Sequence, residues 1–452
     1  MKRNPVFFLL LFLLVASRAP AGTLTLDEAL GKAAAAHPDL TAARHERDAA
    51  LWQLTEAAGH YLPTGRVEEI YMRSNNPVAA FGTDLNQGTF SLMDFQMSDP
   101  NEPDIAEDYI TRLSVEQPIF AGGRITSGVV GAAHMKAAAE RGVEQAGMDV
   151  RFEVERAYLD VLRASRFVDL TKQVVATMER HRQSAGDAFA GGLVLESEVL
   201  QADVYLARAR VSQVEAENNR RLAMAKLNYL MGENQDAVWD LAEPAAVECV
   251  FPESGELIDS AWSRRADLAA MTQRVSAAKA GKLGAAGAFL PEIGLRGEYD
   301  FHDEEKLFGD QAEDWTVYVA AKWELFSGFR DASRTAKAAA NQKVAETRLR
   351  QMREGIALET RRYALELESA TRKLDTARTA VTQSTRHLEI MTNRYEQGLV
   401  KIAELLDAQT AQTEARTGEL NLTYDLVLAR RALLHAVGAT DCDALSPKPS
   451  NN

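Results

Sequence analysis

Few residues of this sequence have the types and spacing that chemistry requires. The eight histidines include no HExxH pair, and the chain has no P-loop, no GxSxG turn and no Rossmann glycine string. Gly281, Gly284 and Gly287 lie in a helical segment rich in Ala and Gly, where they favour close helix packing over phosphate binding. We therefore expect no enzyme activity, no cofactor and no metal site.

Two acidic residues are the strongest candidates for a functional site. Glu404 and Asp407 are three positions apart in a helical segment, so their carboxylates share one face. In a parallel ring of three chains, this pair would place six carboxylates around one axis, and charged rings of this kind select cations in pores. A solvated helix face is the alternative, and the residues alone favour that alternative.

The acidic pair follows a turn between two very long helices. Residues at a seven-residue spacing mark the first of them: Leu367, Leu374, Val381, Leu388 and Tyr395. A heptad pattern sustained over about four heptads predicts a supercoiled helix, and Gly398 ends it. Earlier in the chain, a second long helix reaches Gly192 and returns in the same way, so we expect two helical hairpins.

The two hairpins belong to two copies of one unit. The Gly-Leu-Val segments that begin at Gly192 and Gly398 are 206 positions apart, and Pro63 and Pro291 are 228 positions apart. The separation is constant along each half of the unit, which indicates an internal repeat. Because the separation changes between the two strands of the unit, the first copy has a loop about 22 residues longer. We predict a duplicated β-β-α-α unit, mainly α with a small β part.

The predicted boundaries follow from the periodic segments and their breaks. The first repeat, 22–232, has helices at 25–60, strands at 64–74 and 109–118, a long helix at 125–190 and a return helix at 195–231. A connector at 233–256 leads to the second repeat, 257–438, with a helix at 257–288, strands at 293–301 and 315–325, a long helix at 330–396 and a return helix at 402–437. Residues 439–452 are a C-terminal tail.

The strands of the second copy alternate between apolar and polar residues. Each spans about 9–11 residues, the length of a tilted membrane strand, whereas a half-buried soluble hairpin is the alternative. The smallest membrane barrels have about eight strands, and unpaired sheet edges are costly in lipid. If the four strands of one chain lie in a membrane, several chains must share one barrel, while the charged helices project into the periplasm.

The first residues predict a secretory signal peptide over 1–21. Lys2 and Arg3 precede an apolar run, Val6–Ala16, that is too short to span a bilayer, and a small-residue site ends at Ala21. Removal of this segment moves the formal net charge from −14 to about −17, which argues against nucleic-acid binding. No later segment is apolar for about 20 residues, so no transmembrane helix is expected.

The two cysteines form no metal-binding pattern. Cys249 and Cys442 are isolated in the sequence, with no CxxC spacing. They either pair in an oxidising compartment or stay as two free thiols, and the sequence leaves both alternatives open.

The chain resembles the TolC-like outer membrane efflux proteins. The resemblance rests on the duplicated unit, on the strand-to-helix junctions at 117–124 and 325–328, and on the two Gly-Leu-Val turns, and it covers about residues 25–440. It implies that three chains close a twelve-stranded β-barrel that continues into a periplasmic α-barrel. It also implies a homotrimer in outer membrane lipid, served by a periplasmic adaptor and an inner-membrane pump of the RND or ABC type.

The resemblance also implies roles for residues near the turns. Acidic residues at the offsets of Glu404 and Asp407 form the periplasmic constriction in that family, which favours a pore-lining role over a solvated face. The contacts that hold the closed state match Ser197, Glu198 and Tyr395, although Tyr395 also fits a core position. An Arg of the family pattern is replaced by Val400, which puts a charge-based lock in doubt.

The apolar tips are the expected docking surface for the adaptor. They comprise Gly192, Leu193, Val194, Gly398, Leu399 and Val400, and exposed apolar groups in repeated register suggest an interaction site. The function expected from the sequence is therefore an exit duct of a tripartite efflux or type I secretion system. The alternative is a periplasmic coiled-coil adaptor or structural rod, which would not need strands of bilayer length.

Overall fold

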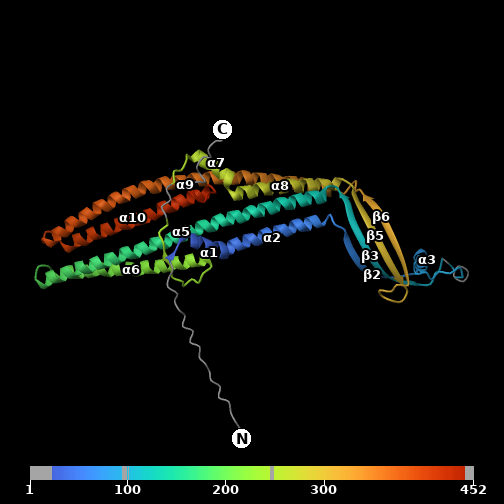
Figure 1. The fold of residues 1–452 in the computed structure, drawn as a ribbon, viewed down its shortest axis with the longest axis horizontal. Coiled ribbons are helices and arrows are strands. Elements are labelled where there is room, and N and C mark those ends of the chain that lie inside the picture. The colour runs from blue at the N-terminus through green and yellow to red at the C-terminus, as the bar shows by residue number, and fades with distance from the viewer. Residues whose placement is uncertain (1–22, 94–98, 100, 245–248, 443–452) are drawn as a thin grey trace, which may run out of the picture. The chain divides into compact units, whose positions relative to one another are not determined.

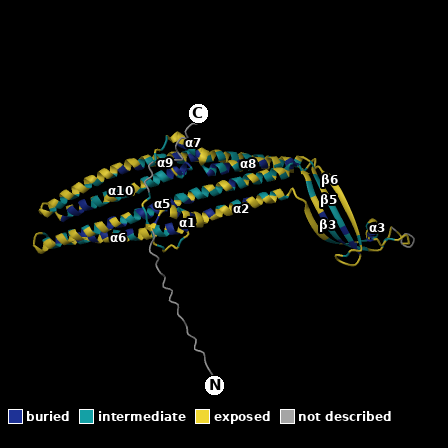
Figure 2. Ribbon diagram, in the orientation of Figure 1, coloured by how far each residue is buried: buried dark blue, intermediate teal, exposed yellow. Residues whose placement is uncertain are grey.

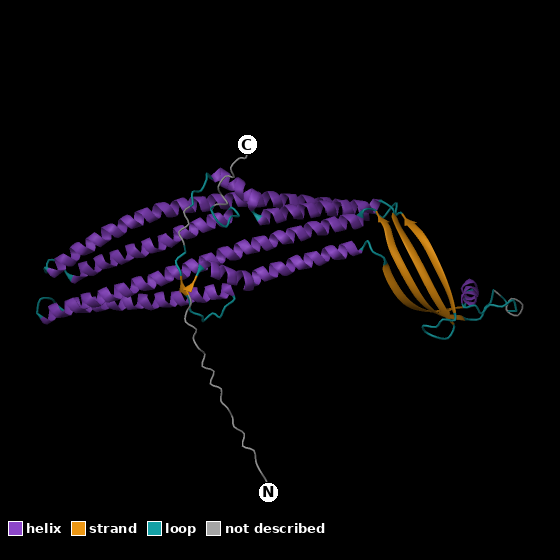
Figure 3. Cartoon of the chain, viewed as in Figure 1, coloured by secondary structure: helices purple, strands orange, loops and turns teal. Residues whose placement is uncertain are grey.

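The fold is mainly α-helical, with one four-stranded sheet (Figure 1, Figure 3). A computed structural model describes residues 23–93, 99, 101–244 and 249–442, so the predicted signal peptide lies outside the described residues, as does most of the predicted tail. The chain divides into two compact units. Among the described residues, one contains 23–41, 146–244, 249–264 and 356–442, and the other contains 42–93, 99, 101–145 and 265–355.

Two long helical hairpins run through the chain. Helix α5 (Arg124–Ala190) is followed by α6 (Glu196–Met231), and α9 (Arg330–Glu396) is followed by α10 (Ile402–Ala436). Their bounds lie within two residues of the helices expected from the heptads. The first unit also holds α1 (Leu26–Ala36) and α7 (Ser254–Arg264). Thr25 begins α1 with a capping box, because its side chain accepts from the Glu28 amide while Glu28 accepts from the Thr25 amide.

A fully buried tyrosine ties the connector of the first unit to α5. Two short parallel strands, β1 (Thr23–Leu24) and β4 (Asp240–Leu241), pair beside it. The Tyr158 hydroxyl lies 2.8 Å from the carbonyl oxygen of Leu24 and 2.6 Å from that of Ala242. Burial raises the pKa of Tyr158 to about 12, and the charge of Glu243 acts in the same direction. The side chain therefore stays a neutral donor at physiological pH.

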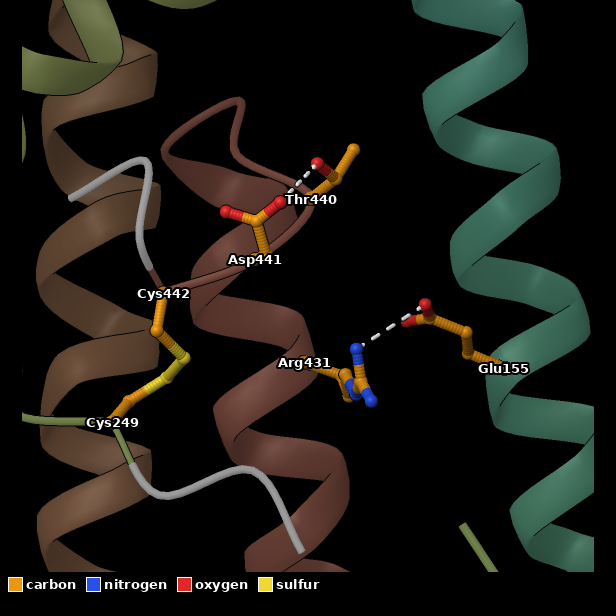
Figure 4. Close-up of a disulfide and its surroundings, with 6 residues drawn as sticks. All are labelled: Glu155, Cys249, Arg431, Thr440, Asp441 and Cys442. Atoms are coloured by element: carbon orange, nitrogen blue, oxygen red, sulfur yellow. Dashed lines mark hydrogen bonds and ion pairs between the residues drawn. A yellow bond between two sulfur atoms is a disulfide. The ribbon is translucent and has the colours of Figure 1, made fainter. Parts of the chain in front are cut away.

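A disulfide closes the same region (Figure 4). Cys249 in the connector and Cys442 after α10 are bonded; their Cα atoms are 5.6 Å apart, and the residues are 193 positions apart in the sequence. Nearby, Arg431 of α10 contacts Glu155 of α5 at 3.5 Å, and both side chains are largely buried. The two cysteines thus pair, which the sequence left open.

The second unit contains the sheet. Its strands are β2 (Thr64–Ser74), β3 (Ala106–Ala121), β5 (Glu292–Asp303) and β6 (Ala312–Lys322). They are antiparallel neighbours in the order β2-β3-β5-β6. Strands β2 and β6 are therefore the two edges, each with one unpaired side. The ladder between β3 and β5 slips between Pro118 and Phe120, where a proline cannot donate to a ladder.

The register of the strands places an apolar row of side chains next to a polar row. The apolar row crosses all four strands through Val67, Leu113, Tyr299 and Trp315, and the next row holds Glu68, Arg112, Asp300 and Asp314. Three members of the apolar row are at least 42% exposed, and Figure 2 shows β6 exposed along its length. In the polar row, Arg112 and Asp300 form a bidentate pair with a closest distance of 2.6 Å.

The long first surface loop contains a helix that the sequence reading did not expect. Helix α3 (Pro77–Asn86) begins at Asn76, whose side chain caps the Val78 and Ala79 amides. Gln87 then fastens the loop, because its side-chain amide donates to the Glu107 carbonyl and to Asp108. His302 lies between Asp108, at 2.8 Å, and Asp314, at 3.1 Å. A buried polar network therefore joins the loop to three strands.

One predicted helix is divided in the structure: the segment expected at 257–288 consists of α7 and α8 (Ala266–Ala286). The helices expected at 25–60 are α1 and α2 (Pro38–Gly59). Pro38 begins α2, where its missing amide costs nothing. Close packing explains Gly287 after α8: a Cβ there would lie 2.1 Å from the Gly122 carbonyl oxygen. Gly284 also packs closely, since its Cβ would lie 3.2 Å from that of Ser127.

Candidate functional site: the hairpin tips and the acidic face of α10

The two hairpins end in turns of the same geometry. In the first, Gly192 has φ +73°, its amide donates to the Phe189 carbonyl at 2.9 Å, and the Leu193 amide donates to Ala188 at 2.9 Å. In the second, Gly398 has φ +70°, and the corresponding bonds join Gly398 to Tyr395 and Leu399 to Arg394, both at 2.9 Å. Both are left-handed helix ends that favour glycine, because a Cβ strains this conformation.

Apolar side chains project from both turns. Leu193 is 82% exposed and Leu399 is 68% exposed, whereas Val194 and Val400 are half-buried. A Cβ built on Gly192 or Gly398 has no atom within 4 Å, so both glycines lie in open space. The structure therefore places the predicted docking residues at two solvent-exposed tips.

Glu404 and Asp407 both lie on the exposed side of α10, within its first two turns. The intervening Leu405 and Leu406 are at most 1% exposed, as is Ile402 one turn earlier. This alternation is that of an amphipathic helix, which buries one stripe and solvates the other. The pair thus shares one exposed face, as its spacing predicts, and that face is fixed by the packing of the buried stripe.

The buried stripe of α10 joins a core between the two hairpins. Its buried members come from α5, α6 and α10: Met178, Ala185, Ala202, Leu206, Ala209, Ile402 and Leu406. Tyr395 of α9 and Tyr205 of α6 pack against this interface core as partly buried residues. The base of the acidic face is therefore held by apolar contacts from both hairpins.

The predicted gate contacts are only partly assembled within one chain. Tyr395 is half-buried against the interface core, and its hydroxyl makes no hydrogen bond among the described residues. Glu198 Oε2 is also buried without a partner there, while Ser197 is exposed. Burial raises the pKa of Tyr395, and the charge of Glu198 adds to this. Both polar groups are therefore without a hydrogen-bond partner in the described part of the chain.

The sequence analysis does not predict a histidine that lies beside these groups. His181 of α5 lines a cavity of about 1470 Å³ together with Glu198, Tyr395 and Glu404. Its Nε2 atom is buried without a partner in the described part of the chain. Burial lowers the pKa of His181, as does Arg180, whereas a hydrogen bond with Gln409 raises it. The core between the hairpins therefore contains a neutral polar group at physiological pH.

Tyr205 is the second residue that the sequence reading missed. Its hydroxyl donates to Asp407 Oδ1 at 2.8 Å, across 202 positions of sequence. The hydrogen bond to Asp407 is the main cause that raises the pKa of Tyr205, followed by burial. No local sequence pattern links two positions so far apart. A repeat-based comparison does not help either, because the residue 206 positions after Tyr205 is Ala411.

Within the described ranges, no group of three or more His, Cys, Asp or Glu side chains is arranged to hold a metal ion. Along the same part of the chain, no helix is both long and apolar enough to cross a membrane.

Comparison with known proteins shows to which class of protein this fold belongs. The crystal structure of the Campylobacter jejuni CmeC outer membrane channel matches 94% of this chain and 87% of its own, with a TM-score of 0.78 at 18% identity. TolC of Vibrio cholerae is 25% identical over 302 residues, which cover 65% of this chain and 68% of TolC. OprJ of Pseudomonas aeruginosa is 24% identical over 330 residues, which cover 69% of this chain and 66% of OprJ. The fold is that of an outer membrane channel.

A family model described as "Outer membrane efflux protein" matches residues 29–233 and 257–439. The chain therefore belongs to the outer membrane efflux protein family, and it is an outer membrane protein of a transport family. This confirms the resemblance and the location expected from the sequence.

Proposed function

We propose that three copies of this chain form an exit duct across the outer membrane, as part of a tripartite efflux or type I secretion system. One observation carries the proposal. The sheet has an exposed apolar row that crosses all four strands, and both of its edge strands have an unpaired side. An exposed apolar face with open edges needs lipid on the face and further strands at the edges.

The number of strands favours a shared barrel. Four strands are too few to close around a lumen, since the smallest membrane barrels have about eight. Edge groups left unpaired in lipid cost several kcal/mol each. If β6 of one chain pairs with β2 of the next, three chains close twelve strands and leave no edge. The polar row with the Arg112–Asp300 pair then faces the lumen, and the row with Trp315 faces lipid.

The helices offer a second surface for neighbouring chains. An apolar stripe on α6 is at least 50% exposed and comprises Leu200, Val204, Val211 and Val214. Its spacing is that of a heptad seam, and the described residues leave it exposed. The matching turns at Gly192 and Gly398 support a duplicated unit, so that each chain contributes two equivalent hairpins to a periplasmic α-barrel.

Glu404 and Asp407 are proposed to line the periplasmic constriction of this duct. In a trimer their exposed face gives six carboxylates near one axis. The narrow entrance is less screened than bulk water, so the pair favours cations over anions. Ser197, Glu198 and Tyr395 are proposed to complete the resting closure, and the unpaired Tyr395 hydroxyl and Glu198 carboxylate are available for a neighbouring chain.

The tips are proposed to dock a periplasmic adaptor. Leu193 and Leu399 are exposed at two turns of equal geometry, which suits a partner built from repeated apolar helix pairs. The adaptor would connect the duct to an inner-membrane pump of the RND or ABC type. Cargo would pass without chemical change, so the protein would act as a transport component and not as an enzyme.

Membrane fractionation followed by native mass spectrometry in mild detergent tests this proposal. We expect outer membrane fractions that require detergent, and a complex of three chains that converts to monomer on heating. A folded monomer with intact β-structure would contradict the proposal. Protein washed from membranes by salt would instead support the periplasmic rod.

A further inference from the structure

The hydrogen bond between Tyr205 and Asp407 joins the acidic face to the other hairpin. Tyr205 belongs to α6, and Asp407 belongs to α10. The tyrosine donates to Asp407 Oδ1 at 2.8 Å. The side chain of Glu404, one turn earlier, makes no hydrogen bond or ion pair within the part of the chain that the structure describes. Of the two acidic residues, only Asp407 is therefore tied to the first hairpin.

The tyrosine is well placed to hold a carboxylate in position. Its ring packs against the interface core and lies 5.6 Å, from ring centroid to guanidinium carbon, beneath Arg208. A ring with two side-chain torsions, both restrained by packing, presents its hydroxyl at a defined point. A hydrogen bond to a charged acceptor is also stronger than one between neutral groups.

A hydrogen bond between His181 and Gln409 also joins the two hairpins, but among the described residues only Tyr205 donates a side-chain hydrogen bond to Asp407. Val400 has no polar side chain, and the Tyr395 hydroxyl makes no hydrogen bond among the described residues. The interface core is apolar and therefore resists separation of the hairpins without fixing the direction of Asp407. The hydrogen bond from Tyr205 is thus the polar contact that fixes the position of the Asp407 carboxylate.

We propose that Tyr205 is a positioning residue for the constriction: it holds Asp407 and links the two hairpins in the resting, closed state. This inference rests on the proposed function. Its chemistry differs from that of a charge-based lock, because a neutral hydroxyl donates to a single carboxylate and leaves the charge of that carboxylate unchanged. Loss of the hydroxyl therefore affects closure, whereas loss of the carboxylate affects both closure and ion selectivity.

Single-channel recording of the full-length trimer with Tyr205→Phe tests the proposal. We expect the ratio of open to closed time to rise about fivefold or more, from the loss of one hydrogen bond per chain. The cation preference should stay that of the parent, because all six carboxylates are retained. Tyr229→Phe is the matched control, since Tyr229 is an exposed tyrosine on the same helix whose hydroxyl has no partner among the described residues.

A double-mutant cycle separates positioning from a general structural effect. In an Asp407→Ala background, Tyr205→Phe should cause no further opening, because the contact is already absent. Equal opening by Tyr205→Phe and the parent, or additive effects of the two substitutions, would overturn the inference. Either result leaves the proposed function intact as long as the protein forms cation-preferring channels. If it forms no channel, the proposed function itself fails.

Discussion

Substitution of the two turn glycines tests docking of the adaptor separately from folding of the chain. We consider the double substitution Gly192→Leu and Gly398→Leu. Both glycines have φ near +70°, a conformation that costs a residue with a Cβ about 1–2 kcal/mol. No atom lies within 4 Å of either added Cβ, so no steric clash adds to this cost. The double variant should therefore lose about 2–4 kcal/mol per chain and still fold.

The expected phenotype is a trimer that no longer exports. The added side chains change the surface that the adaptor would contact, and the strain disturbs both turns. Trimer content and melting temperature would be measured on purified protein, and export would be measured as survival of a duct-deficient strain exposed to a pump substrate. Gly355→Leu is the matched control, because Gly355 is exposed on α9 with ordinary helical backbone and open space around it.

The control should retain export and gain slightly in stability, since leucine is the better helix former by nearly 1 kcal/mol. If the double variant exports as well as the parent, the tips are not a docking surface. If it fails to form trimers while Gly355→Leu forms them, the strain estimate is wrong.

Three further sets of substitutions test the packing of the chain. Cys249→Ser with Cys442→Ser should lower stability by up to about 5 kcal/mol, measured by denaturant unfolding, since the bridge closes a loop of 193 positions; unchanged stability would contradict this. The raised pKa of Tyr158 means that its stabilisation is complete below pH 10 and is lost as pH rises to about 12. This loss of about 2–3 kcal/mol should be absent in Tyr158→Phe. If the parent and Tyr158→Phe have the same melting profile at alkaline pH, the prediction is wrong. His302→Leu should lower the heat resistance of the folded protein more than the double variant His302→Leu with Asp108→Leu, because the single change leaves the buried Asp108 carboxylate with the Gln87 amide as its one remaining side-chain partner. The reverse order would contradict a stabilising role of the buried network.

Sequence periodicity predicts the long helices because their signals are local. The heptads before Tyr395 and the stop at Gly398 together predict a helix over 330–396, and α9 has these bounds. The face shared by Glu404 and Asp407 follows in the same way from helical spacing alone. Helix α3 also has a local signal, an N-cap residue at Asn76 followed by Pro77, but the polar composition around it is typical of a loop.

The remaining contacts depend on packing between distant segments. Tyr205 and Asp407 meet because two hairpins bury a common core, and no spacing in the chain encodes their 2.8 Å contact. The bond between Cys249 and Cys442 likewise follows from how the connector returns to the end of α10. Long-range pairs of this kind need the fold before they can be assigned.

The central claim is that this chain forms a duct whose narrowest part carries the carboxylates of Glu404 and Asp407. Single-channel recording in a planar bilayer, with the parent compared to the double variant Glu404→Ala with Asp407→Ala, tests it most directly. We predict that the parent prefers cations and is blocked by trivalent cations from the periplasmic side. The double variant should lose most of both properties while its trimer stays intact, because six like charges are removed. A double variant that keeps the cation preference and the trivalent block of the parent would contradict the claim.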